Sequence, residues 1–65
     1  MRILVNDEQR DVTNTTLATI LNELGYGGAR IATAVNGTFI PASQRDTVTI
    51  IEGASLEVLA PMQGG

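Results

Sequence analysis

The sequence predicts a small α+β domain in which one helix covers one face of a single mixed sheet. The chain has 65 residues, enough for one domain. One stretch carries leucine and isoleucine at helical spacing, and short β-prone runs joined by turn residues lie on both sides of it. A further run of alternating polarity comes near the C-terminus. This order of hairpin, helix, hairpin and strand permits two layers around one core.

A first hairpin is predicted at the N-terminus. Residues 1–5 form a short apolar strand, and residues 8–12 return as a more polar strand. Asn6 and Asp7 between them tolerate the unusual backbone angles of a tight turn.

A helix is predicted over residues 16–24. Residues 13–16 (Thr-Asn-Thr-Thr) offer several side-chain oxygens that can cap its first amides. Gly25 is the residue type that commonly follows the end of a helix. Four apolar residues at positions i, i+3, i+4 and i+7 form one hydrophobic stripe: Leu17, Ile20, Leu21 and Leu24.

The second hairpin follows a glycine-containing loop. Residues 31–35 are the third strand, Asn36-Gly37 is a strong hairpin turn signal, and residues 38–40 begin the return. Pro41 ends that strand because proline has no amide to donate to the ladder.

The remainder of the chain contains the last strand. We expect a polar loop over residues 42–47, a short strand or turn over residues 48–51, and a reversal at Glu52-Gly53. Residues 56–60 form the final strand, and residues 61–65 show no pattern. The chain therefore divides into a domain over residues 1–60 and a flexible C-terminal tail over residues 61–65 that ends in Gly-Gly.

In such an order the last strand commonly lies in the centre of the sheet, parallel to the first, with the helix packed across both. This arrangement is the β-grasp architecture. A small α+β sandwich with another strand order is the alternative that the local patterns leave open.

The composition argues against several classes of function. The chain has no His, Cys or Lys, and general acid–base catalysis near neutral pH usually depends on such residues. We therefore expect a protein that is not an enzyme and binds no metal or cofactor itself. A net charge of −3 disfavours nucleic acid as a partner and suits a partner with a basic docking surface. Because no run of ~18 apolar residues is present, we expect no membrane span and a cytoplasmic protein.

These features together resemble a known family. The hairpin–helix–hairpin–strand order, the stretch Ala34-Val35-Asn36-Gly37 leading to Ile40-Pro41, and the ending Met62-Gln63-Gly64-Gly65 are similar to the ThiS-type sulfur carriers of thiamine biosynthesis, which are ubiquitin-like proteins. The resemblance covers the whole chain.

The resemblance implies a specific chemistry at Gly65. A ThiF-like adenylating enzyme would bind ATP and magnesium and adenylate the C-terminal carboxylate. A sulfur donor system would then convert the acyl-adenylate to a thiocarboxylate. A ThiG-like thiazole synthase would take that sulfur for the thiazole ring of thiamine.

The two terminal glycines suit this chemistry on physical grounds. Because glycine has no Cβ, Gly64 and Gly65 can pass through a channel too narrow for other residues. Five extended residues reach roughly 17 Å. The carboxylate could therefore enter a buried active site while the domain stays outside.

A docking surface is predicted on the uncovered face of the sheet. If Ile3 and Val5 point toward the helix, Leu4 points away from it, and in the last strand Leu59 also points outward. Because the first and last strands are expected to be neighbours, we expect Leu4 and Leu59 to lie together as a partner-binding patch.

The sequence is also compatible with other functions. The chain could carry sulfur for molybdopterin or for another pathway. It could also be a ubiquitin-like interaction module that docks by its sheet and never uses its carboxylate.

Overall fold

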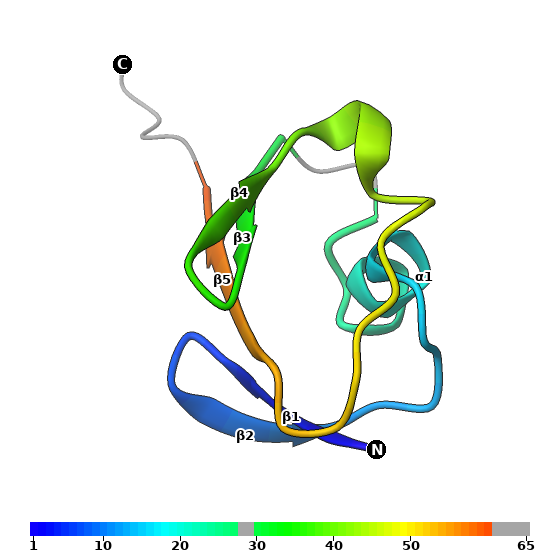
Figure 1. Ribbon diagram of the computed structural model, residues 1–65, viewed down its shortest axis with the longest axis vertical. Helices are drawn as coiled ribbons and strands as arrows, with labels where there is room; N and C mark the ends of the chain where they lie inside the picture. The colour runs from blue at the N-terminus through cyan, green and yellow to red at the C-terminus, as the bar shows by residue number, and fades with distance from the viewer. Residues whose placement is uncertain (28–29, 61–65) are drawn as a thin grey trace.

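A computed structural model of the chain describes residues 1–27 and 30–60. The predicted tail at residues 61–65 lies outside the described residues. The elements in chain order are β1 (Arg2–Val5), β2 (Glu8–Asp11), α1 (Leu17–Glu23), β3 (Ala32–Val35), β4 (Thr38–Ile40), the 3-10 helix η1 (Ala42–Gln44) and β5 (Ser55–Leu59) (Figure 1).

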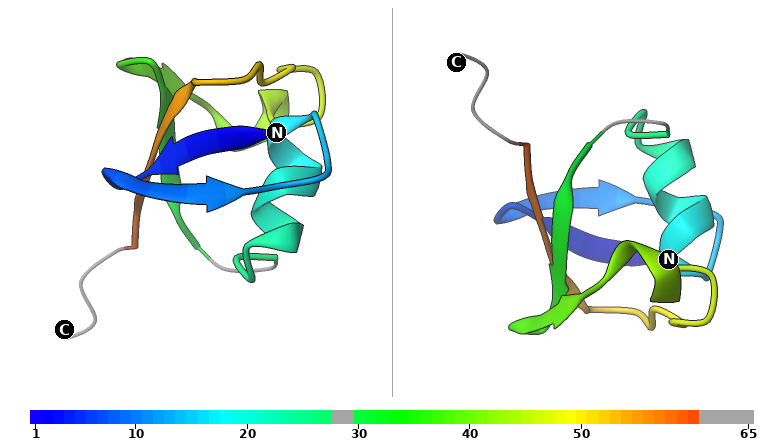
Figure 2. Two further views of the ribbon diagram at one scale, coloured as in Figure 1. Left: turned by 90° about the horizontal axis from the view of Figure 1, so that it is seen from below. Right: turned by 90° about the horizontal axis from the view of Figure 1, so that it is seen from above.

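The five strands form one mixed sheet with the order β2-β1-β5-β3-β4. β5 is central, parallel to β1 and antiparallel to β3. Helix α1 lies against one face of this sheet and leaves the other face uncovered (Figures 1 and 2). The predicted β-grasp architecture is confirmed, including the central parallel position of the last strand.

The core lies between the sheet and the helix. The helix contributes three residues of its predicted stripe to it, Leu17, Ile20 and Leu21, and Leu24 packs at its margin. Alternate residues of the central strands supply the other side: Ile3, Val5, Leu56 and Val58. The helical period of 3.6 and the strand period of 2 therefore predicted the burial of these residues correctly.

Both ends of α1 have the expected capping residues. The Thr16 side chain accepts a hydrogen bond from the Thr19 amide at the N-terminus. At the other end the Tyr26 amide donates to the Leu21 carbonyl and the Gly25 amide to the Asn22 carbonyl, the two bonds of a Schellman motif. Gly25 adopts φ +94°, a left-handed angle that side chains disfavour. The helix is one residue shorter at each end than predicted because Thr16 and Leu24 are its caps.

The two hairpin turns have the same backbone geometry. Asn6 and Asp7 in the first turn and Asn36 and Gly37 in the second all have positive φ. Positive φ at both central residues is the requirement of a type I′ turn, whose twist matches that of the flanking strands. The turn predictions are therefore confirmed at both places.

The connection between β4 and β5 departs from the prediction. The expected polar loop contains η1, and residues 48–51, predicted as a short strand or turn, form an extended segment with one isolated bridge, from Thr49 to Thr16. Its backbone bonds go to the start of α1: the Leu17 amide donates to the Val48 carbonyl, and the Ile50 amide donates to the Thr15 carbonyl. Residues at the start of α1 therefore provide the backbone hydrogen bonds that a neighbouring strand would otherwise provide.

Glu23 ties the end of α1 to the segment that precedes the helix. Its carboxylate accepts hydrogen bonds from the Thr13 amide at 2.9 Å and the Asn14 amide at 3.1 Å, and from both of those side chains. The bonds to the Thr13 and Asn14 amides lower the pKa of Glu23 from its ordinary value. The contact is on the surface of the domain.

Across residues 1–27 and 30–60, the structure has no helix with the length and apolar character needed to cross a membrane.

Candidate functional site: the uncovered sheet face and the end of β5

β5 is the strand that leads toward the two glycines, and it is hydrogen-bonded on both sides. It pairs with β1 and β3, and two turn asparagines add bonds at its flanks. The Asn6 side chain donates to the Val58 carbonyl at 3.1 Å and accepts from the Val58 amide at 2.8 Å. The Asn36 side chain accepts from the Ser55 amide at 2.9 Å, and the Asn36 amide donates to the Ser55 carbonyl.

These side-chain bonds were not anticipated from the sequence. Both asparagines were recognised as turn residues, which explains their backbone angles but not the direction of their side chains. The Asn6 side chain imitates both a backbone amide and a carbonyl, whereas the Asn36 side chain imitates only a carbonyl. β5 is thereby positioned almost to its last residue.

Gly64 and Gly65, predicted as the threading residue and the reactive terminus, lie outside the described residues. The last described residue is Ala60, directly after β5. The surface around Leu59 and Ala60 is therefore the part of the domain from which residues 61–65 start.

The uncovered face of the sheet carries two exposed large apolar side chains. Leu59 on β5 is 70% exposed and Phe39 on β4 is 63% exposed. Between them on β3 lie Ala32, opposite Leu59, and Ala34, opposite Phe39. Because the alanine side chains are short, they leave a shallow groove of about 120 Å³ between the two larger ones, with Glu57 at its border.

The predicted pairing of Leu4 with Leu59 is wrong in its detail. Both side chains lie on the uncovered face, as expected, and β1 is next to β5. However, the partner of Leu4 in β5 is Ser55, four residues before Leu59. Four strand residues span about 13 Å, so the two leucines do not form one contiguous patch. Leu4 is also half-buried, whereas Leu59 is exposed.

The apolar neighbour of Leu59 on this face is the groove with Phe39. Phe39 was not selected from the sequence, because strand residues 38–40 were too few to show which side faced the core. The signal that identifies it is the register of β4 against β3, which is a property of the folded sheet.

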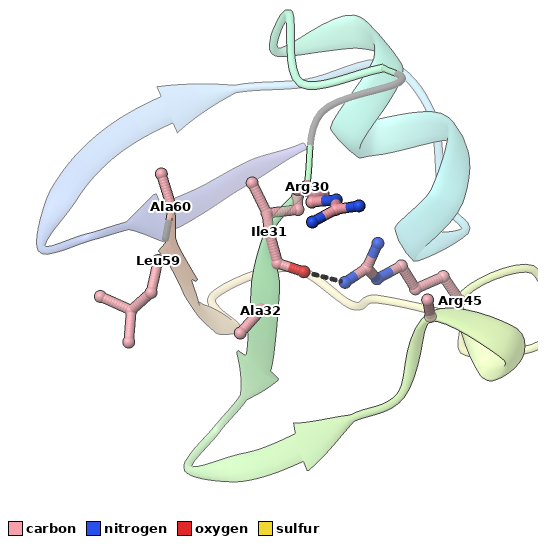
Figure 3. Close-up of a pocket in the computed structure, with 7 residues that line it drawn as sticks. Arg30, Ile31, Ala32, Arg45, Leu59 and Ala60 are labelled. Atoms are coloured by element: carbon pink, nitrogen blue, oxygen red, sulfur yellow. Dashed lines mark hydrogen bonds between the residues drawn. The ribbon is translucent and has the colours of Figure 1, made fainter. Parts of the chain in front are cut away.

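A second hollow lies at the end of β5, and we refer to it as the tail-root pocket. It has a volume of about 520 Å³. Its lining comes from the start of β3 and the two residues before it, from η1 and the residue after η1, and from the end of β5 and the residue after β5: Arg30, Ile31, Ala32, Ala42, Arg45, Leu59 and Ala60 (Figure 3).

Arg45 is held in place at the wall of this pocket. Its Nη2 donates to the Ile31 carbonyl at 2.7 Å, and its Nε donates to the Thr33 hydroxyl at 3.3 Å. Thr33 is 2% exposed and in turn donates to the Ile40 carbonyl. Arg45 therefore satisfies a buried hydroxyl while its guanidinium stays at the surface of the pocket.

The fold and these surfaces define a class of protein: a small β-grasp, ubiquitin-like domain whose central strand leads toward Gly64 and Gly65. The comparisons with known proteins identify the family within this class. The family model described as "ThiS family" matches residues 3–65, so the chain belongs to the ThiS family. The predicted resemblance to ThiS-type sulfur carriers is thus confirmed.

Solved structures of similar proteins agree with this assignment. The crystal structure of the thiamine biosynthesis protein ThiS from Geobacter metallireducens is 25% identical, with a TM-score of 0.84, and each chain is covered over 100% of its length. A solution structure of a thiamine biosynthesis protein from the same organism has a TM-score of 0.80 at 23% identity, covering 100% of this chain and 88% of the other. The second likeness supports the fold.

A curated relative links the chain to a longer protein. A thiazole synthase of Paramagnetospirillum magneticum (strain ATCC 700264 / AMB-1) is 30% identical over 66 residues. The match covers 100% of this chain and 20% of that protein. The chain therefore spans about one fifth of the length of this relative.

Proposed function

We propose that this protein carries sulfur as a thiocarboxylate on Gly65 for the thiazole ring of thiamine. A ThiF-like adenylating enzyme would use ATP and magnesium to join the Gly65 carboxylate to AMP, with release of pyrophosphate. A sulfur donor system would then displace AMP and leave the thiocarboxylate. A ThiG-like thiazole synthase would receive the sulfur.

The observation that carries this proposal is the family match, which extends through Gly64 and Gly65. The composition supports it as well. Without His, Cys or Lys, the chain lacks the usual side chains for activating a carboxylate, so the phosphoryl chemistry must come from a partner. The acyl-adenylate is a reactive mixed anhydride, and a closed partner site would protect it from water.

The relative from Paramagnetospirillum supports the choice of acceptor. A segment similar to this whole chain occupies one fifth of a protein named thiazole synthase. Such a segment within one polypeptide would remain close to the synthase that uses its sulfur. Together with the family, this favours thiamine over molybdopterin as the pathway.

The proposal is tested by measuring the intact mass of the protein after incubation with ATP, magnesium, the adenylating enzyme and a sulfur donor. We expect the mass to rise by the difference between sulfur and oxygen, with the change located on Gly65 by fragmentation.

Deletion of Gly65 should abolish the mass change. The reactive carbon is then withdrawn by about 3.4 Å, and misplacement by even ~1 Å can slow a reaction on the order of 100-fold. Gly64→Val should also fail because its side chain blocks the narrow channel, while its thermal stability should match the wild type. Equal modification of the wild type and the deletion variant would exclude the Gly65 carboxylate as the sulfur-carrying group.

A further inference from the structure

The tail-root pocket collects positive charge on an acidic chain. The protein has four arginines and a net charge of −3, and two of those arginines, Arg30 and Arg45, line this one pocket. Within the described part of the chain, the one ion pair joins Arg2 to Asp11 at 3.0 Å, on β1 and β2. The carboxylates of the described residues therefore form no ion pair with the two arginines of the pocket.

The two guanidinium groups are arranged to act together. Figure 3 shows both on the same side of β3, and both line the same hollow. Arg45 is fixed by its bonds to Ile31 and Thr33, which use two of the five N–H groups of a guanidinium. Arg30 is exposed and projects from the segment just before β3. Two neighbouring cations repel each other, and an anion between them removes that repulsion.

The rest of the pocket wall is apolar. Ile31, Ala32, Ala42, Leu59 and Ala60 contribute aliphatic groups. An occupant that combines a carboxylate with adjacent apolar atoms matches both parts of this lining. An acidic side chain flanked by hydrophobic residues on a protein surface has this chemistry, and arginine binds carboxylates in bidentate fashion.

The position of the pocket indicates which protein supplies that segment. Any enzyme that takes residues 61–65 into its active site must also approach Leu59 and Ala60, from which those residues start. Since five residues reach at most about 17 Å, the reacting nucleotide would lie far from the pocket when the segment is extended, and the rim of the enzyme's channel would lie close to it.

We infer that the tail-root pocket, with Arg30 and Arg45, binds an acidic, apolar-flanked segment at the channel entrance of the adenylating enzyme. This inference rests on the proposed function. The net charge of −3 suggested a partner with a basic docking surface. At this one pocket, by contrast, the partner's surface is inferred to be acidic. The positive pocket aligns the domain so that its glycine end faces the enzyme, because the rest of the acidic surface is attracted less strongly to that entrance.

The test measures the affinity of the ThiF-like adenylating enzyme for four variants and the wild type. Arg30→Glu should weaken binding more than about tenfold at about 0.1 M salt, because a like charge then faces the partner's carboxylate. Arg30→Lys, which keeps the charge but loses the bidentate geometry of the guanidinium, should weaken binding less than Arg30→Glu does. Ala42→Asp places a negative charge in the pocket without altering either arginine and should also weaken binding.

Arg10→Glu is the matched control. It makes the same change in net charge at an exposed residue of β2, an edge strand on the other side of the sheet order. Its affinity should remain within about threefold of the wild type. The loss caused by Arg30→Glu should shrink at about 0.5 M salt, because added ions screen the interaction.

The inference is overturned if Arg30→Glu and Arg10→Glu weaken binding equally, or if Ala42→Asp binds like the wild type. If the wild type still binds the adenylating enzyme and forms the thiocarboxylate in that case, the proposed function stands and only this inference is wrong. If the wild type neither binds the adenylating enzyme nor gains sulfur, both the proposed function and this inference are wrong. Melting temperatures of all variants, measured alongside, confirm that folded proteins are compared.

Discussion

The two faces of the sheet are built from the same strands, yet their side chains differ in size, exposure and neighbours. On the inner face Leu56 and Val58 of β5 are almost completely buried against α1. On the outer face of the same strand, Leu59 is 70% exposed and Glu57 borders a shallow groove. Leu56 contributes to folding, whereas Glu57, the next residue, and Leu59, three residues after Leu56, are available to a partner.

This difference separates stability from recognition. The inner face must be filled completely because a small domain has few apolar contacts to lose. The outer face can change with little cost to folding, and it lies next to Leu59 and Ala60, from which residues 61–65 start. Substitutions that affect one face and spare the other therefore test whether this division holds.

Leu56→Ala should have the largest effect on stability. Leu56 is 0% exposed at the centre of the sheet, and truncation of such a leucine typically costs about 2–5 kcal/mol of unfolding free energy. Leu59→Ala, the same change on the other face of β5, should stay within about 0.5 kcal/mol. Urea denaturation of both variants makes the comparison, and similar losses in the two would contradict it.

Asn6→Ala should have the next largest effect. It removes both bonds to Val58 and leaves a part-buried backbone amide and carbonyl without their partner, at a cost of about 1–3 kcal/mol. Asn6→Gly separates the two roles of the residue, since glycine keeps the positive φ but not the side chain. Hydrogen exchange should accelerate at the Val58 amide in both variants, with the Ser55 amide, bound by Asn36, as the internal reference. Unchanged exchange at Val58 would show that the turn angle alone matters.

Leu59→Glu should weaken binding of the adenylating enzyme and leave folding intact. Interface anchors often cost more than about 1 kcal/mol of binding free energy when altered. Phe39→Glu tests the other side of the groove. Leu4→Glu tests how far the docking surface extends along the sheet, because Leu4 lies about 13 Å from Leu59 along the strands. Calorimetric titration at fixed salt measures the affinities, and no change in any of the three variants would exclude the outer face as the docking surface.

Glu23→Gln should have the smallest effect, visible as a change in the pH dependence of stability. The folded-state pKa of Glu23 lies below the unfolded value of about 4.3, so its carboxylate stabilises the fold above that pH. The stabilisation is lost as the pH falls through the folded-state pKa. Melting temperatures measured from pH 7 downward should therefore drop less steeply for Glu23→Gln below about pH 5 than for the wild type. Parallel curves would show that the Glu23 bonds to Thr13 and Asn14 contribute nothing.

Much of the fold could be predicted because its signals are local. Thr16 and Gly25 mark the helix ends through bonds to residues within five positions, and the turns at Asn6 and Asn36 depend on the angles of two residues each. The conformation of residues 48–51 could not be predicted in the same way. Their hydrogen bonds go to Thr15 and Leu17, more than thirty positions away, so their own composition did not distinguish a strand from an extended loop.

The sequence by itself determined which residues of α1, β1 and β5 face the core, where the chain turns and which family the chain resembles, because each depends on a short pattern or on residue identity. The tertiary structure alone decided the register of β1 against β5, and hence that Leu4 lies opposite Ser55 and far from Leu59. It also decided that Phe39 shares a groove with Leu59, and that Arg30 and Arg45 meet at one pocket. The alternation of a strand shows which face a side chain occupies, but it does not show which residue of a distant strand lies beside it. That choice is made by the packing of the whole sheet against the helix.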